Sequence, residues 1–413
     1  MKIALRILSN KLVQNTLATI LFRLSILIMG VIFARNLGAE LYGEFVLVRS
    51  TVQILETALG ISLGIAVSKV FLINKDVFIS VVNSSVCFIA TVNIFAFIVF
   101  VVLFDISDFS GANIFVVFFY SIVTLFFQFF LNFLKGVGDF KLVFTVSIVY
   151  LISTLVVSYC LTLSMSGANS AVISYIVILC TSFATMLILG FKWFLKLELK
   201  LKFKLVDVLS FYKLDAFPVM LSAMLSPLIV WLVNILIASG DNGIHDLSLF
   251  NVSYLLYGLM TFFPVVLAET YFKRIAEEIK NNSNVFNLLC KYSVVLLLLN
   301  IPLSLFFYCF SKDILLLYGE AFLASLQSFR LFILCSFLTC TLPLLGKLFI
   351  LSGFSFFNLI SNVIWGGLVL GFVLFGRYYF SVDTPLLCAI SISFSYFIVL
   401  VMQWSVAYKR FAK

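Results

Sequence analysis

The chain has 413 residues, of which 63% are hydrophobic and only 11% charged, and its mean hydropathy is +1.20. This composition excludes a water-exposed globular surface and predicts a polytopic membrane protein. The formal net charge of +9 follows the pattern of membrane topology described below, so it does not indicate a protein that binds nucleic acid.

The apolar stretches are long enough to cross a bilayer as helices. A helix needs about 20 mostly apolar residues to span a hydrocarbon core of about 30 Å, whereas transmembrane strands are about half as long and alternate in polarity. We therefore expect an all-α polytopic membrane protein with about twelve transmembrane helices. In chain order, the predicted spans are residues 12–34, 44–68, 77–104, 112–134, 142–163, 169–191, 215–239, 247–270, 286–310, 325–346, 354–376 and 384–408.

A basic segment divides these spans into two groups of six. Residues 192–214 include the run LELKLKFKL, which alternates Leu or Phe with Lys. We expect residues 1–191 and 215–413 to form two six-helix lobes around a central cavity. The linker between them either touches anionic lipid or is only a cytoplasmic connection.

Lys and Arg residues alternate between the two sides of the predicted spans. On the side of the N-terminus lie 21 of the 27, whereas Arg35, Lys312, Arg330 and Arg377 lie on the opposite side. Because cytoplasmic loops carry the excess of Lys and Arg, both termini are predicted to be cytoplasmic.

Neither the cysteines nor the histidine indicates a metal or a cofactor. The eight cysteines fall almost wholly inside spans without C-x-x-C spacing, which is typical of packing residues. His245 lies beside Asp241 and Asp246 in an outward loop, and we expect no metal site there. The sequence has no G-x-x-x-x-G-K-[ST] motif for ATP, so any driving force must be a proton or sodium gradient or the removal of product.

Ionised residues inside the spans are the strongest functional signal, because a charge at mid-depth costs about 2.5 to 3.5 kcal/mol on insertion scales. Arg23, Arg49 and Glu56 are such residues. At a rise of 1.5 Å per residue, Arg23 and Glu56 lie about 17 Å below the outer ends of their spans and Arg49 about 8 Å. Two interpretations are open: Arg23 and Glu56 form a structural ion pair, or they line a substrate path.

Polar side chains accompany these charges on the same helix faces. Arg49 shares a face with Gln53, Glu56, Gly60 and Gly64 at spacings of three and four, and Asn15, Thr19 and Arg23 form a similar stripe. Such stripes normally face a bundle interior or an aqueous cavity. Further candidates for this lining, each of which could instead be a helix-packing group, are Gln128, Asn132, Lys135, Ser222, Ser226, Asn234, Asn251, Tyr254 and Tyr257. A cationic cavity with these neighbours suits an anionic head group that carries sugars.

Three segments resemble the signatures of one transporter family. Residues 34–45, ARNLGAELYGEF, resemble the A-R-x-L-G-x-x-x-Y-G-x-[FY] motif of polysaccharide-export flippases. Residues 136–141 resemble the G-x-x-x-[FY]-[KR] element of that family, and residues 316–322 are similar to its L-Y-G-x-x-[FY] element. In the first segment, Arg35 lies at the outer membrane boundary, and we expect Gly38 and Gly43 to shape a tight loop.

The resemblance implies the multidrug/oligosaccharidyl-lipid/polysaccharide exporter (MOP) superfamily and, within it, the Wzx-type O-antigen flippases. Such proteins move undecaprenyl-pyrophosphate-linked oligosaccharide from the cytoplasmic to the periplasmic leaflet of the bacterial inner membrane by alternating access. The cationic cavity of the family matches Arg23 and Arg49 by residue type and place. Partners implied are the lipid-linked oligosaccharide, membrane lipid and, as candidates, an O-antigen polymerase and a chain-length regulator of lipopolysaccharide biosynthesis.

Other functions fit the sequence less well. A cation-coupled drug antiporter of the same superfamily would favour acidic groups in its cavity, although Glu56, or Asp215 at the inner mouth of the seventh span, could carry a coupling ion. A membrane O-antigen polymerase or glycosyltransferase would need a long outward loop with catalytic residues, and the longest such loop is only residues 311–324. We therefore expect a transporter and not an enzyme.

Overall fold

The computed structural model is nearly all helical in the residues that it describes, which are 11–73, 75–103, 113–164, 167–190, 210–268, 271, 275, 285–352, 354–379 and 383–411. Within them, eleven helical segments are long and apolar enough to cross a membrane. The first of these, Val13–Phe71, contains two predicted spans joined at a kink. The prediction of an all-α, multi-pass membrane protein is therefore confirmed.

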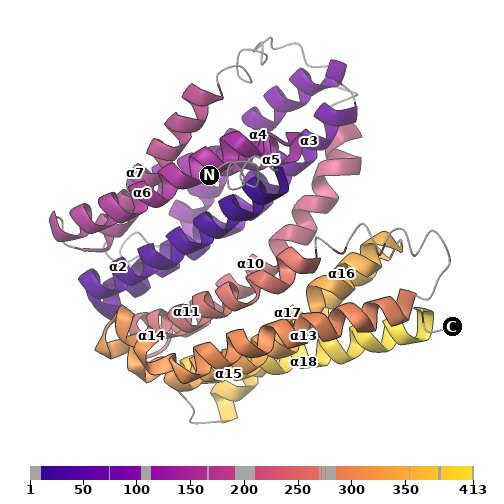
Figure 1. Ribbon diagram of the computed structural model, residues 1–413. Helices are drawn as coiled ribbons and strands as arrows, with labels where there is room; N and C mark the ends of the chain where they lie inside the picture. The colour runs from indigo at the N-terminus through magenta and orange to yellow at the C-terminus, as the bar shows by residue number, and fades with distance from the viewer. Residues whose placement is uncertain are drawn as a thin grey trace, which may run out of the picture. The chain divides into compact units, whose positions relative to one another are not determined.

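The chain forms two compact units, Met1–Trp231 and Leu232–Lys413, which Figure 1 shows in colours from indigo to yellow. The boundary falls inside helix α10 (Phe217–Ala238). The division predicted from the basic linker at residues 192–214 stays a prediction, because residues 191–209 lie outside the described part of the chain.

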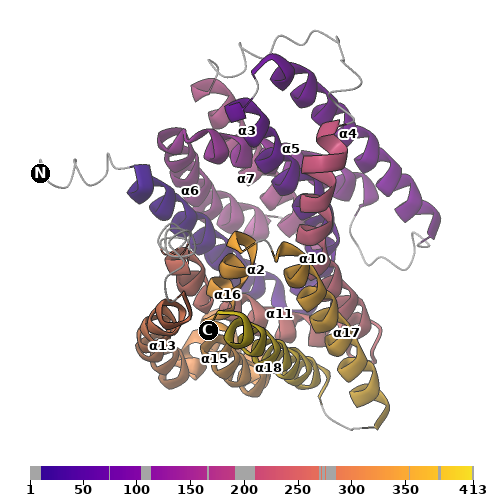
Figure 2. The same cartoon turned by 90° about the vertical axis from the view of Figure 1, so that its right-hand side faces the viewer.

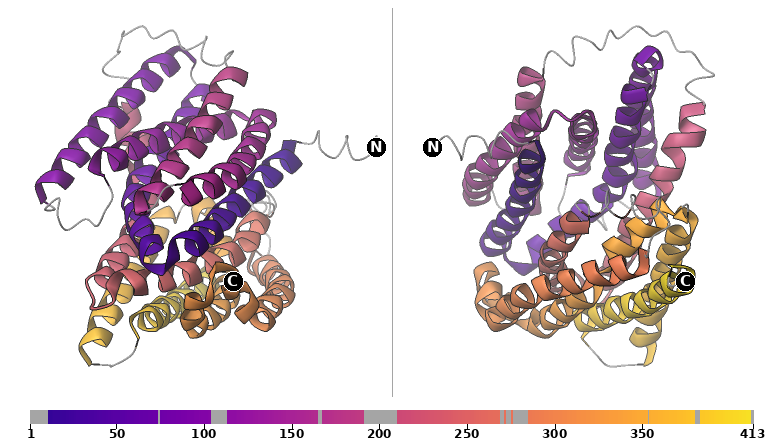
Figure 3. Two further views of the ribbon diagram at one scale, coloured as in Figure 1. Left: turned by 90° about the vertical axis from the view of Figure 1, so that its left-hand side faces the viewer. Right: turned by 45° about the vertical axis from the view of Figure 1, so that its right-hand side comes forward.

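Unit 1 is a bundle in which α6 packs along both α2 and α7, and α3 packs along α5. Figure 2 and Figure 3 show this arrangement from other sides. Its elements are α2 (Lys11–Leu55), η1 (Glu56–Ile61), α3 (Ser62–Ile73), α4 (Lys75–Leu103), α5 (Ile114–Val137), α6 (Phe140–Ser164), α7 (Ala168–Leu189) and η2 (Tyr212–Ala216), followed by the start of α10.

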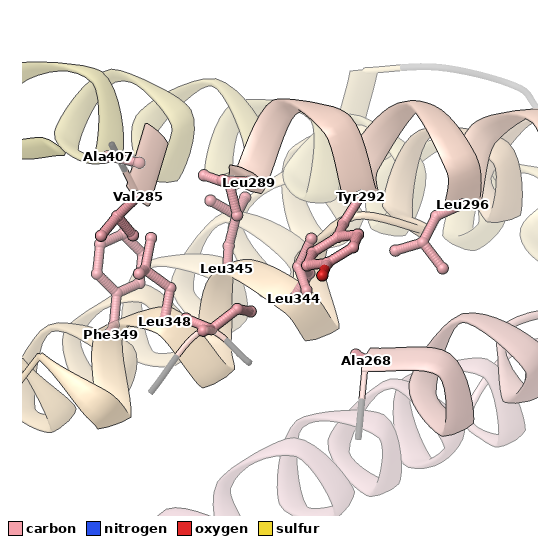
Figure 4. Packing of buried hydrophobic residues seen from close by; sticks show 11 residues of the cluster. Ala268, Val285, Leu289, Tyr292, Leu296, Leu344, Leu345, Leu348, Phe349 and Ala407 are labelled. Atoms are coloured by element: carbon pink, nitrogen blue, oxygen red, sulfur yellow. The ribbon is translucent and has the colours of Figure 1, made fainter. Parts of the chain in front are cut away.

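Unit 2 is also helical, and its last helix packs against both α15 and α17. After the end of α10 come α11 (Gly243–Met260), α13 (Val285–Cys309), α14 (Ser311–Tyr318), η3 (Glu320–Ser325), α15 (Leu326–Thr339), α16 (Leu342–Leu351), α17 (Ser355–Tyr379) and α18 (Thr384–Phe411). Figure 4 shows part of its apolar core, where Leu344, Leu348 and Phe349 of α16 pack beside Leu289 and Tyr292 of α13.

The segments that resemble flippase motifs form turns. Gly38 has φ 81 and ψ 175, a backbone conformation that favours glycine, and it separates the two halves of α2. Beyond it, Tyr42 and Phe45 are only 1% exposed. Gly43 lies within helical backbone, so the expectation that it also shapes the loop is wrong.

The other two motif segments also turn at a glycine with a positive φ. Gly138 has φ 85 and ends α5, where its N–H bonds the carbonyl oxygen of Leu134. Gly319 has φ 126 between α14 and η3, and the flanking Tyr318 and Phe322 are each 1% exposed. In all three segments, a glycine makes the turn.

Candidate functional site

The strongest candidate for a binding site lies in unit 1, around Arg49 of α2. The guanidinium carbon of Arg49 lies 5.7 Å from the centroid of the Tyr175 ring on α7, a distance at which the electron-rich face of a ring attracts a cation. Tyr120 of α5 and Tyr150 of α6 are further electrostatic neighbours of Arg49. Three helices thus each place a tyrosine near one arginine.

These tyrosines are held by packing. Tyr120, Tyr150 and Tyr175 are 0%, 2% and 4% exposed, respectively. The ring centroids of Tyr120 and Tyr175 are 5.4 Å apart, and Phe22 of α2 packs edge-on against Tyr150 at 5.2 Å. Because their surroundings fix these rings, the environment of Arg49 is formed before any ligand arrives.

The three tyrosines were not among the site residues predicted from the sequence. A signal was present for two of them, because Arg49, Tyr120 and Tyr175 each lie between about one and a half and two helical turns from the outer ends of their predicted spans. Residues at one depth on neighbouring helices can meet. Which helices are neighbours, and which way each one faces, came only from the structure.

Glu56 is held by a hydrogen bond from α5. The amide Nε2 of Gln128 donates to Oε1 of Glu56 at 2.7 Å, and Nδ2 of Asn132 donates to the backbone oxygen of Gln128 at 2.8 Å. Glu56 also begins the π-helical turn η1, a local geometry that often marks functional sites. The structure therefore brings together three predicted site residues.

Arg23 and Glu56 do not form the ion pair that was one of the two interpretations open from the sequence. Instead, Arg49 is the cation that acts on Glu56, and it also repels Arg23. The physical reason is the orientation of Glu56, which points to Gln128 on α5. Arg23 is exposed and Arg49 is partly exposed, and neither guanidinium makes a hydrogen bond or an ion pair with the described residues.

Gly60 and Gly64 face α5 rather than a cavity, contrary to the predicted stripe. A Cβ on Gly60 would lie 2.9 Å from the Cβ of Gln128, and one on Gly64 would lie 2.5 Å from the carbonyl oxygen of Phe129. Further along, a Cβ on Gly136 would collide with the side chain of Ser68. Small residues thus allow η1 and α3 to approach α5 closely, as is common between membrane helices.

Two other predicted residues of unit 1 lie on accessible surface. Gln53 is exposed and Asn15 is partly exposed. The backbone oxygen of Asn15 accepts a hydrogen bond from Thr19 at 2.8 Å. Asp215 lies in the η2 turn, and its side chain falls outside the described part of the structure.

The predicted residues of unit 2 differ among themselves in burial. Asn234 is 1% exposed, and neither its Oδ1 nor its Nδ2 has a hydrogen-bond partner among the residues that the structure describes. Asn251 and Tyr254 are partly exposed on one face of α11. Asn234 is therefore a core residue in this structure, whereas Asn251 and Tyr254 reach the surface in part.

No family model and no curated protein matches the sequence, but solved structures match the fold. An inward-facing multidrug resistance MATE family transporter of the MOP superfamily aligns with a TM-score of 0.78 at 14% identity, covering 94% of each chain. The lipid II flippase MurJ, in an inward closed conformation, aligns with a TM-score of 0.72 at 16% identity, covering 95% of this chain and 87% of MurJ.

The chain has the fold of the MOP-superfamily transporters. A third match is a MOP transporter from Pyrococcus furiosus, for which reverse polarity of the binding pocket suggests a different function. It aligns with a TM-score of 0.66 at 15% identity over 97% of this chain and 95% of the other. Identities this low establish the fold and leave the substrate to the residues of the site.

Proposed function

We propose that the protein is a flippase that moves undecaprenyl-pyrophosphate-linked O-antigen oligosaccharide from the cytoplasmic to the periplasmic leaflet of the bacterial inner membrane by alternating access. The main observation behind this proposal is the environment of the Arg49 side chain. Its guanidinium is partly exposed, lies over Tyr175 and has no hydrogen-bond or ion-pair partner among the described residues. A guanidinium carries five N–H donors in a planar fork that matches phosphate oxygens.

The balance of charge supports an anionic ligand. Arg23 and Arg49 act on each other electrostatically, whereas Glu56 is the carboxylate that acts on Arg49. This part of unit 1 therefore carries more positive than negative charge within a membrane-spanning bundle, where unpaired charge is costly and usually has a function. A pyrophosphate would supply two phosphate groups for two arginines.

The fold supports transport rather than catalysis, because it is shared with transporters, among them a lipid II flippase and multidrug transporters. The Pyrococcus furiosus transporter, for which reverse polarity of the binding pocket suggests a different function, supports the idea that one architecture serves different functions. On this proposal, the polyprenyl tail stays in lipid while the head group crosses, and an O-antigen polymerase and a chain-length regulator act on the product.

A cation-coupled drug antiporter is the second candidate, and Glu56 is the observation that favours it. A carboxylate inside a span, hydrogen-bonded to Gln128, can take up a proton or a sodium ion. In the flippase, the same residue is our candidate for ion coupling. The antiporter would extrude a lipophilic cation such as ethidium, and its transport would not require Arg49.

Complementation tests the proposal. The gene is deleted from its native strain, which supplies the matching lipid-linked sugar, and surface polysaccharide is measured after expression of each variant at equal membrane levels. We expect full rescue by wild type, partial rescue by Arg49→Lys and no rescue by Arg49→Ala. Arg35→Ala is the matched control, because Arg35 is exposed beside the Gly38 turn. Failure of wild type, or full rescue by Arg49→Ala, would contradict the proposal.

A further inference from the structure

Unit 2 contains a row of four aromatic side chains from three helices, which we call the aromatic row: Tyr254 and Tyr257 of α11, Tyr396 of α18 and Trp365 of α17. The ring centroids of Tyr254 and Tyr257 are 5.8 Å apart, those of Tyr257 and Tyr396 are 6.2 Å apart, and those of Tyr396 and Trp365 are 5.0 Å apart. Phe332 of α15, which is 0% exposed, packs against the row, and its ring centroid lies 5.8 Å from that of Tyr254.

The members of the row differ in exposure and hydrogen bonding. Tyr257 is 6% exposed, and its hydroxyl lies 3.1 Å from Oγ1 of Thr339, so it is already paired. Tyr254 is partly exposed, and its hydroxyl makes no hydrogen bond with any described residue. Trp365 is 3% exposed, and its buried Nε1 donor has no partner in the described part of the chain. The row therefore has two unused polar groups.

The helix segments that carry the row are uncharged. Residues 247–260 of α11, 355–376 of α17 and 384–408 of α18 contain no Asp, Glu, Lys, Arg or His, and the charged residues of these helices lie at their ends. A site for a lipophilic cation would gain from a carboxylate, and a site for phosphate from a cation. Phenol hydroxyls that donate and accept, together with an indole N–H and apolar ring surface, suit a neutral ligand with many hydroxyl groups.

We propose that the aromatic row is a saccharide-binding subsite that recognises the neutral sugars of the transported molecule. The inference rests on the proposed function and divides recognition between the units: the cationic residues of unit 1 bind the phosphates, and the aromatic row of unit 2 binds the sugars. The Tyr254 hydroxyl donates to or accepts from a sugar hydroxyl, and the aromatic rings contact the apolar surface of the sugar. The row thereby sets which repeat unit is accepted.

Binding of two separate probes tests this division. The first probe is the oligosaccharide that mild acid releases from the surface polysaccharide of the native strain, which has neither lipid nor phosphate. The second is undecaprenyl pyrophosphate without sugar. Equilibrium dialysis with purified full-length protein in nanodiscs measures both, and the variants are Tyr254→Phe, Tyr396→Phe and Arg49→Ala. Tyr292→Phe is the matched control, because Tyr292 packs in the separate apolar cluster of unit 2.

We expect saturable oligosaccharide binding that Tyr254→Phe weakens about fivefold, the usual effect of one lost neutral hydrogen bond. Tyr396→Phe should weaken it less, and Tyr292→Phe and Arg49→Ala should leave it unchanged. Phe retains the ring, so unit 2 keeps its packing. Conversely, undecaprenyl pyrophosphate should lose affinity in Arg49→Ala and retain it in Tyr254→Phe.

The outcomes separate the two proposals. If wild type binds undecaprenyl pyrophosphate through Arg49 but not the oligosaccharide, the saccharide subsite is wrong and the flippase proposal stands. If the oligosaccharide binds through Tyr254 but Arg49→Ala does not affect the pyrophosphate probe, the phosphate site is wrong and the subsite stands. If tetraphenylphosphonium binds through Tyr254 and the oligosaccharide does not bind, the saccharide subsite is wrong and the ligand of the aromatic row is a lipophilic cation.

Discussion

The guanidinium of Arg49 lies 5.7 Å from the centre of the Tyr175 ring, so the ring stabilises the positive charge without occupying any of its N–H donors. A carboxylate in the same place would neutralise the charge and fill those donors. The only carboxylate that acts on Arg49 within the described part of the chain, Glu56, is instead hydrogen-bonded to Gln128. This arrangement keeps an arginine ready for an external anion.

Tyr175→Leu should weaken the binding of undecaprenyl pyrophosphate by roughly 2-fold to 30-fold, because a cation–π contact contributes about 0.5 to 2 kcal/mol. Tyr175→Phe should retain most of the affinity, since the ring face remains. Titration in nanodiscs measures both. Equal affinity of Tyr175→Leu and wild type would show that the ring does not help to hold the charge.

Gln128→Leu should reduce the free energy of unfolding by about 1 to 3 kcal/mol, because it leaves the Glu56 carboxylate without its hydrogen-bond donor. Thermal unfolding in detergent, monitored by circular dichroism, gives the change. Gln53→Leu is the matched control, since Gln53 is exposed, and it should alter stability little. Equal stability of the two variants would show that the hydrogen bond from Gln128 to Glu56 does not stabilise the protein.

Arg23→Ala and Glu56→Ala should have additive effects on stability, with a coupling energy below about 0.5 kcal/mol, because these side chains form no ion pair. A double-mutant cycle under the same conditions measures this energy. Recovery of stability in the double variant would instead reveal a direct Arg23–Glu56 interaction.

Gly64→Ala should destabilise the protein by about 1 to 3 kcal/mol, because the new Cβ would lie 2.5 Å from the carbonyl oxygen of Phe129. Gly371→Ala in α17 is the control, since a Cβ there meets nothing within 4 Å. It should leave stability unchanged or raise it by up to about 1 kcal/mol. Similar effects of the two substitutions would argue against close packing of α3 on α5.

The sequence predicted the helices well because an apolar run of about 20 residues has few alternatives in a bilayer. It predicted the turn at Gly38 for a similar local reason, as φ 81 favours glycine. It also predicted Glu56, Gln128 and Asn132 as candidate site residues, and the structure places them close together. It could not pair them, because depth along a helix does not determine which way a side chain points.

The rotation of each helix about its axis and the identity of its neighbouring helices account for the site residues that the sequence did not predict. Glu56 lies at the start of a π-helical turn, which alters the phase of the residues that follow, so the regular spacing that placed Gly60 and Gly64 beside Arg49 did not hold. The tyrosines near Arg49 come from α5, α6 and α7, and no local pattern in those helices indicates that they converge on α2.

Translocation in proteoliposomes tests the central claim most directly. Undecaprenyl-pyrophosphate-linked oligosaccharide from the native strain is incorporated with purified protein, and the fraction of sugar protected from periodate added outside is followed over time. Wild type should exchange the lipid between leaflets, whereas Arg49→Ala should be slower by at least about tenfold, the loss expected when charge-assisted hydrogen bonds to phosphate are removed. Equal rates in both, or no exchange by wild type, would contradict a flippase that binds its head group through Arg49.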